Sequence, residues 1–367
     1  GLMQEWPVDG PELIWHIEGL GEGHSSAAVT KDAVYIGGTE LENGFVIALD
    51  HSGKELWKKV YGKEWMDSYN GVRISPMVYD GIVYVMSGLG KITAMSAADG
   101  NILWSKNILT DFGSENTRWG ITENFVADGE KLYCTPGGSE VSMVALDRKS
   151  GQLIWKAKGN GEKSAYCSPA LIKLANRNLL VTHTSNSIIG VDAETGTLLW
   201  SSDHPNKYSI HPNTPLYKDG YLFCYSGYGK GGVMLELGED GGSVKEVWRN
   251  ELMDNQMGGA VLIDGKIYGS GHTNREWFCL DWKTGEVLHS AKMLSNGNVV
   301  YSDGKLYCYG DSGEVALVDV SNGSFEKVSS FRVPFGEKQH WAHLVINNKR
   351  LYVRHGSSLM VYSIKAN

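Results

Sequence analysis

Eight short segments of the chain carry side chains that suit ligand binding. Each segment lies just upstream of a tight turn between two β-rich runs, and together they supply imidazole, guanidinium, amide, phenol and indole groups. Such groups donate or accept hydrogen bonds or stack on flat ligands, and a concave site lined by a few of them is the usual form of a binding pocket. The predicted site residues are His24, Arg73, Trp119, Tyr166, His211, Gln256, Asn298 and His340. An alternative is that these side chains only satisfy backbone groups in loops.

Further aromatic residues stand in the longer predicted loops. They suit stacking on a sugar, a peptide or a quinone ring, and packing between structural units is the alternative. These residues are Trp65, Tyr69, Trp119, Tyr208 and Trp341. His340 and His343 invite a metal interpretation, but residues three apart at the start of a strand point to opposite faces. We therefore predict no metal ligand set.

The elements that position these residues are read from repeated turns. Asp-Gly, the strongest short signal for a β-hairpin, stands at Asp80, Asp128, Asp219, Asp264 and Asp303. Weaker versions begin at residues 32, 176 and 347. The eight turns are 39 to 48 residues apart. A period of that length is typical of repeat folds.

A second motif follows most of the hairpins, with the form Asp-x-x-Thr/Ser-Gly-x-x-x-Trp. It is clearest from Asp147 to Trp155 and recurs at Asp192 to Trp200. The Asp can cap the turn, the Gly takes a positive φ, and the Trp can pack between neighbouring sheets. Each repeat is therefore four short strands, and such a sheet buries both faces only by stacking radially with copies of itself.

The sequence predicts an all-β fold, an eight-bladed β-propeller with four antiparallel strands per blade in one domain over 1–367. The last repeat lacks its fourth strand, and residues 1–15, with Glu12 to Trp15 as the strand, are expected to close the ring by completing that blade. The expected blades span approximately 24–57, 73–104, 120–155, 166–200, 211–248, 257–289, 297–328 and 340–364.

These repeats resemble the pyrroloquinoline-quinone-like propeller family, also called quinoprotein dehydrogenase-like, through the motif quoted above. The resemblance covers nearly the whole chain and implies the fold more specifically than the function. Family members include quinone-dependent alcohol and sugar dehydrogenases and also non-enzymatic assembly and sensor modules. The enzymes hold pyrroloquinoline quinone and calcium, with a disulfide between adjacent cysteines over the quinone. No two of the five cysteines here are adjacent. Glu123-Asn124 could imitate the acidic and amide calcium ligands of the enzymes, but the side chains of adjacent strand residues diverge.

Charge and hydropathy exclude two further classes of function. A net charge of -8 without a Lys/Arg cluster argues against nucleic-acid binding, and no apolar run approaches the roughly 20 residues that span a bilayer. We predict a non-catalytic binding, assembly or sensor propeller, monomeric, that takes a small molecule, a carbohydrate or a protein segment at its central mouth. The resemblance implies a periplasmic or cell-surface location. The alternative is a quinone-dependent dehydrogenase; no cofactor is implied by the residues alone.

Overall fold

Tight turns set the local structure. In the computed structural model, which describes residues 1–366, Asp80 and Gly81 both have positive φ, 48° and 75°. Such φ values belong to the two-residue turns whose twist matches a β-hairpin. The same pair of positive angles recurs at Asp219-Gly220, Asp264-Gly265 and Asp303-Gly304. The described residues form strands and turns and contain no helix.

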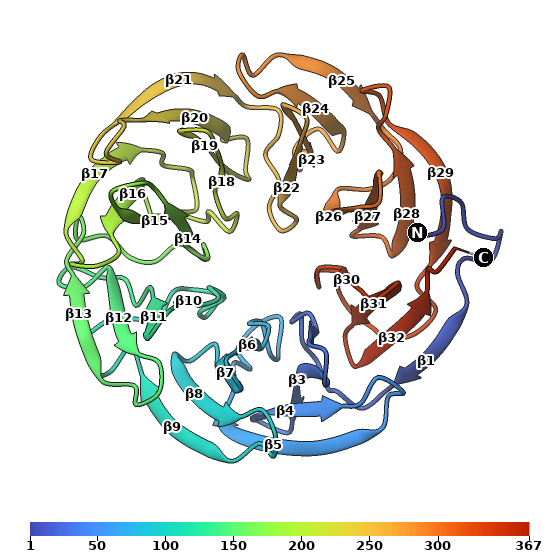
Figure 1. Ribbon diagram of the computed structural model, residues 1–367, viewed down its shortest axis with the longest axis horizontal. Coiled ribbons are helices and arrows are strands. Elements are labelled where there is room, and N and C mark those ends of the chain that lie inside the picture. Colours follow the sequence, from blue (N-terminus) through green and yellow to red (C-terminus); the bar gives the residue numbers. More distant parts are fainter. Residues whose placement is uncertain (367) are drawn as a thin grey trace.

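The strands form eight antiparallel sheets of four strands, arranged as a ring (Figure 1). This confirms the predicted eight-bladed propeller. Blade 1 contains β2 (Ala28–Val29), β3 (Val34–Glu40), β4 (Asn43–Leu49) and β5 (Glu55–Lys63). Blade 2 contains β6 (Met77–Tyr79), β7 (Ile82–Met86), β8 (Lys91–Ser96) and β9 (Ile102–Asn107). Blade 3 contains β10 (Val126–Asp128), β11 (Lys131–Cys134), β12 (Met143–Asp147) and β13 (Leu153–Ala157). Blade 4 contains β14 (Ala170–Lys173), β15 (Asn178–His183), β16 (Ser187–Asp192) and β17 (Leu198–Asp203).

The second half of the ring repeats this order. Blade 5 contains β18 (Leu216–Lys218), β19 (Tyr221–Ser226), β20 (Gly231–Leu237) and β21 (Val244–Asn250). Blade 6 contains β22 (Ala260–Ile263), β23 (Lys266–Ser270), β24 (Trp277–Asp281) and β25 (Val287–Ala291). Blade 7 contains β26 (Gly297–Ser302), β27 (Lys305–Gly310), β28 (Glu314–Asp319) and β29 (Glu326–Arg332). Blade 8 contains β30 (Val345–Asn347), β31 (Arg350–His355), β32 (Ser358–Ser363) and β1 (Leu13–Ile17).

An N-terminal strand closes the ring, as the sequence predicts. β1 pairs antiparallel with β32, with Trp15 opposite Val361, and runs to Ile17, two residues beyond the expected end. Leu2 forms a further bridge with Lys365, so the two ends of the chain lie side by side (Figure 1). Closure leaves β32 without an open edge, which removes a site for pairing with other chains.

The hydrophobic core lies between neighbouring blades. One cluster joins Tyr84 and Ile92 of blade 2 to Leu132 and Val144 of blade 3, and comparable clusters occupy the other seams. The seam between blades 8 and 1 is built in the same way, with Leu359 and Val361 against Val34 and Ile36. Each sheet is covered on both faces by its neighbours, so an isolated blade could not bury its apolar faces.

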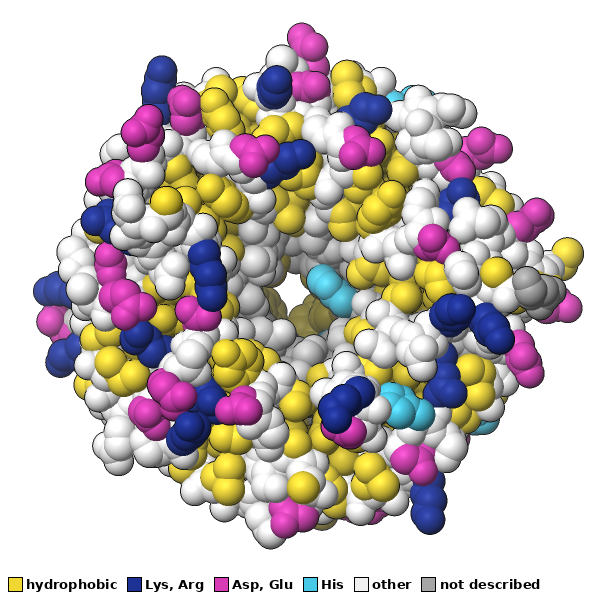
Figure 2. All heavy atoms as spheres, viewed as in Figure 1, with side chains coloured by type: hydrophobic (Ala, Val, Ile, Leu, Met, Phe, Trp, Pro, Cys, Tyr) yellow, Lys and Arg dark blue, Asp and Glu magenta, His cyan; other side chains and the backbone are white. Residues whose placement is uncertain are grey.

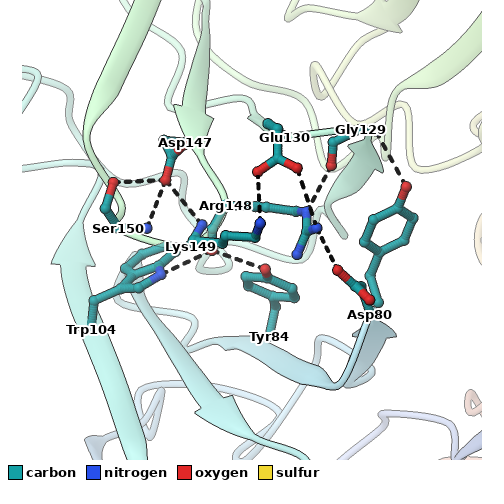
Figure 3. A network of polar contacts seen from close by, with 10 residues as sticks. Asp80, Tyr84, Trp104, Gly129, Glu130, Asp147, Arg148, Lys149 and Ser150 are labelled. Atoms are coloured by element: carbon teal, nitrogen blue, oxygen red, sulfur yellow. Dashed lines mark hydrogen bonds and ion pairs between the residues drawn. The ribbon is translucent and has the colours of Figure 1, made fainter.

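Tryptophans of the repeat motif contact the next blade across the seam, the interface between neighbouring blades, as Figure 3 shows for blades 2 and 3. Trp104 Nε1 donates to the Arg148 carbonyl oxygen at 3.0 Å, and the Tyr84 hydroxyl donates to the same oxygen at 2.9 Å. The Asp147 carboxylate caps the turn by accepting from the backbone N–H of Ser150 at 2.8 Å. Gly151 has φ +71°, and a Cβ there would lie 2.7 Å from the Trp104 ring. The motif therefore needs Gly at that position for both conformation and space.

Candidate functional site

The loops that enter the innermost strands converge on a cavity at one mouth of the ring. The ring is hollowed at its axis, and charged side chains of both signs are dispersed over the face that Figure 2 shows. The cavity has a volume of about 1240 Å³. Every blade contributes to its wall through a loop or the first residues of a strand, from His24 in blade 1 to Trp341 in blade 8. A concave wall that mixes aromatic side chains with a few polar ones is typical of a ligand site.

Aromatic rings form a continuous arc on one side of the cavity. Tyr69 stands between Trp119 and Trp341, with ring centroids 5.8 Å and 4.9 Å away, and Trp341 contacts the His24 ring at 5.0 Å. Such an arc offers several flat apolar faces to a ligand.

Another aromatic cluster stands elsewhere in the cavity wall. Tyr208 and Tyr228 meet edge to face at 4.7 Å, and Tyr228 contacts His272 at 6.1 Å. The side chains of Tyr69 and Tyr208 are 46% and 51% exposed, which leaves their rings open to a ligand.

Three cavity tyrosines hold an uncommon backbone conformation. Tyr69, Tyr166 and Tyr228 have φ of 45°, 70° and 62°, in the left-handed region that bulky residues rarely occupy. The cost is of the order of 1 kcal/mol for each residue, and such strain persists where the surrounding structure enforces it, often at binding sites. These angles turn the three loops so that their rings line the cavity.

The cavity wall is cationic in a chain with a net charge of -8. Two arginines, Arg73 and Arg118, line it, and within residues 1–366 no Asp or Glu does. Arg73 donates to the backbone oxygens of Ser68 and Tyr69, and burial lowers its pKa to about 10, so it stays charged at neutral pH. Arg118 lies over the Trp119 ring at 4.8 Å. Burial, with the nearby charges of Arg354 and Arg73, lowers the pKa of His24 to about 3, so its imidazole is neutral.

Five of the eight predicted site residues meet at this cavity. They are His24, Arg73, Trp119, Tyr166 and Gln256. Of the loop aromatics, Tyr69, Trp119, Tyr208 and Trp341 line the wall as well. Trp65 does not: it is buried, and its Nε1 donates to the Ser68 carbonyl oxygen at 2.8 Å.

The other three predicted site residues lie away from the cavity wall. Asn298 falls inside β26 and is buried, bonding the Ala342 carbonyl oxygen at 3.0 Å. His340 stacks on His355 at 3.6 Å and meets the Tyr309 hydroxyl at 2.6 Å. His211 turns into the seam between blades 4 and 5, where its Nε2 lies 3.1 Å from the Ser185 carbonyl oxygen. At these three positions the repeat pattern predicts a side chain at the mouth. A longer entry loop, or a strand that begins one residue earlier, turns the side chain away from it.

The sequence did not predict several of the residues that line the cavity. Tyr228 lies in the turn between β19 and β20, and His272 in the loop between β23 and β24. Both loops open on the same face as the entry loops, since they begin where the second strand of the blade ends. The glycine-rich stretch from Ser226 to Gly232 was the available signal, because it predicts a long reversal rather than a tight hairpin.

The residues do not fit the quinone and calcium site of the enzymes. The five cysteines are all free and buried, and Cys134, Cys224 and Cys308 lie within strands of separate blades. Glu123, the candidate calcium ligand, is 1% exposed, and its carboxylate accepts from the Ser164 hydroxyl and from the backbone N–H of Tyr166 and Thr122. Burial raises its pKa despite these bonds. A carboxylate used in this way does not face the cavity, so we derive no step through that cofactor.

Within residues 1–366 we find no helix with the length and apolar character needed to cross a membrane.

The fold and the repeated motif define a propeller of the pyrroloquinoline-quinone-like type. A family model described as outer membrane protein assembly factor BamB matches residues 42–291 and 184–367, and the chain belongs to this family.

The chain is similar both to assembly factors and to quinone-dependent dehydrogenases. An outer membrane protein assembly factor BamB from Moranella endobia is 26% identical over 265 residues, covering 68% of this chain and 65% of the relative. The quinoprotein alcohol dehydrogenase PedH from Pseudomonas putida is 23% identical over 269 residues, covering 71% of this chain and 40% of the enzyme. The chain thus spans less than two thirds of the length of either relative. The crystal structure of BamB from Moraxella catarrhalis superposes with a TM-score of 0.69 at 16% identity, covering 97% of this chain and 98% of that one, which shows the shared fold.

Proposed function

We propose that this protein is a non-catalytic, protein-binding propeller, monomeric in solution, that holds an extended segment of a partner protein in its axial cavity. The protein acts in the periplasm or at the cell surface, as its family does. The observation that carries the proposal is the cavity wall itself, in which the described residues supply an arc of aromatic rings and two arginines but no Asp or Glu side chain.

The chemistry of the wall indicates what kind of segment would enter. Tyr69, Trp119 and Trp341 offer flat apolar faces for aromatic or proline side chains of a peptide. Arg73 and Arg118 offer guanidinium donors, which form paired hydrogen bonds with a carboxylate. We infer that an acidic peptide with aromatic residues binds better than a neutral or basic one. Family membership supports a protein partner, because the family is that of the outer membrane protein assembly factor BamB.

A fluorescence titration tests this proposal. Trp119 and Trp341 lie in the wall, so a bound peptide changes their emission. The probes are a 12-residue peptide that alternates Glu or Asp with Phe or Tyr, and the same peptide with every acidic residue replaced by Lys. We expect saturable binding of the acidic peptide and at least a tenfold weaker affinity for the Lys version. Equal affinity for the two peptides would refute the charge argument.

Variants locate the binding. Trp119→Ala and Arg118→Ala should each weaken binding of the acidic peptide by about tenfold, which corresponds to about 1.4 kcal/mol. Tyr301→Ala is the matched control, because Tyr301 is 43% exposed on β26 and does not line the cavity. Unchanged affinity in both cavity variants would place the peptide elsewhere. A panel of oligosaccharides is titrated in parallel, and preferential sugar binding that depends on Trp119 would reject a protein partner in favour of a carbohydrate.

A further inference from the structure

Three histidines lie together in the seam between blades 4 and 5. His183 is the last residue of β15, His204 directly follows β17, and His211 lies in the loop before β18. One ring nitrogen of each lies within 4.8 Å of the others. All three side chains are buried, with 2%, 0% and 0% exposure. They come from separate parts of two blades, so only the packing of the ring brings them together.

The hydrogen bonds of these histidines leave ring nitrogens without partners. His211 Nε2 lies 3.1 Å from the Ser185 carbonyl oxygen, which fixes the proton on Nε2, and its Nδ1 has no partner. Neither ring nitrogen of His183 has a hydrogen-bond partner in the described part of the chain. A buried polar group without a partner is costly and requires an explanation such as a bound ion.

The arrangement around His211 is the usual one for a metal ligand. A histidine that binds a metal through one nitrogen commonly donates its other N–H to a carbonyl oxygen, which orients the ring. His183 and His211 stack with their planes 3° apart and their centroids at 5.1 Å. Neutral imidazoles are ligands for divalent transition metals, and three of them with one open position is a common zinc arrangement.

Two cationic side chains, Lys230 and Arg249, lie near the cluster. Arg249 Nη1 lies 3.4 Å from His204 Nδ1, and it would repel a cation. The same guanidinium, however, bonds both oxygens of Glu246 at 2.8 Å, which offsets its charge. The other nitrogen of His204 lies 3.4 Å from the Ser226 hydroxyl. Both contacts of His204 are long and can be exchanged for a metal bond.

We propose that His183, His204 and His211 form a binding site for one divalent transition metal ion, with zinc as the expected ion. Zinc holds imidazole nitrogens at about 2.0–2.1 Å, so the three rings would close by on the order of 1 Å from their present separation. The ion would tie β15 of blade 4 to the loop that enters blade 5. That loop carries Tyr208, which lines the axial cavity, between two of the ligands. Zinc would therefore hold one wall of the cavity in place, although the metal site does not depend on what the cavity binds.

The test uses the full chain, stripped with a chelator and titrated with Zn²⁺ or with Co²⁺, whose visible spectrum reports nitrogen coordination. We expect one ion per chain with a dissociation constant below 10 µM, on the order expected for a preformed three-histidine site. His183→Asn, His204→Asn and His211→Asn should each weaken binding by at least a hundredfold. His289→Ala, on β25 of blade 6, is the matched control and should leave it unchanged.

A thermal measurement keeps the result independent of folding defects in the variants. A hundredfold excess of Zn²⁺ over its dissociation constant should raise the Tm of the wild-type chain by about 3 °C for a protein of this length. The His211→Asn variant should melt as one transition, and its Tm should not respond to Zn²⁺. Absence of stoichiometric binding by the wild-type chain would overturn the proposal, as would a zinc affinity in all three variants equal to that of the wild-type chain. Trp119→Ala should bind zinc normally, which separates this site from the proposed peptide site.

Discussion

Removing Trp15 tests how strongly the N-terminal strand closes the ring. The Trp15 indole packs on Gly53, where an added Cβ would lie 2.8 Å from the ring, and contacts Tyr352 edge to face at 6.5 Å. Its Nε1 donates to the His51 carbonyl oxygen at 3.1 Å. Trp15→Ala loses this packing and this bond, at a cost of about 2–4 kcal/mol for a half-buried indole.

The expected change in Tm follows from the size of the protein. Unfolding entropies of about 2.1 cal/mol/K per residue give about 0.8 kcal/mol per degree for 367 residues, so Tm should fall by about 3–5 °C. Ile14→Ala is the matched control on the same strand, because Ile14 is 40% exposed and should cost less than about 1 kcal/mol.

Deletion of residues 1–17 extends the same test. It exposes the edge of β32 and uncovers the apolar cluster that Leu2 and Trp6 complete, so we expect a larger fall in Tm and concentration-dependent aggregation. Differential scanning calorimetry and light scattering report both effects. If the truncated chain melts at the temperature of the full chain and stays monodisperse, the closure argument is wrong.

Three further predictions concern the seams and the pH dependence. Gly151→Ala should lower the free energy of unfolding by at least about 2 kcal/mol, because the Trp104 ring blocks the added Cβ. Gly220 also has a positive φ, of 86°, but has open space at its Cβ position, so Gly220→Ala should cost about 1 kcal/mol. Equal losses in chemical denaturation would contradict the steric argument. Arg148→Met should cost about 2–3 kcal/mol, since buried Arg148 donates at 2.6 Å to Asp80 and to the Gly129 carbonyl oxygen (Figure 3), while exposed Lys149→Met should change stability little. Burial lowers the pKa of His24 to about 3, so the folded chain binds fewer protons than the unfolded one between pH 6.5 and 3. The free energy of unfolding should therefore fall as pH falls through that window, by at most about 1.4 kcal/mol per pH unit for this group. His24→Asn should reduce this slope, as measured by urea unfolding at stepped pH.

Much of the fold is determined by local sequence. Asp-Gly pairs such as Asp80-Gly81 dictate two-residue turns, because few other residues accept two successive positive φ angles. The Asp-x-x-Ser-Gly turn at Asp147 to Gly151 and the Trp that follows it specify how one sheet docks on the next. Since each repeat carries the same local signals, the number of blades and the need for an N-terminal closing strand follow from counting them.

The site depended on distances that no repeat pattern encodes. The position before an inner strand predicts the mouth for His24 and Gln256, yet at His211 a longer loop turns the imidazole into the seam, where Nε2 finds the Ser185 carbonyl oxygen. The three-histidine cluster had no sequence signal, since two whole strands, β16 and β17, and the loops around them separate His183 from His211. Local turn chemistry acts within about ten residues and can be read along the chain, whereas the meeting of side chains from different blades is decided only when all eight sheets pack against one another.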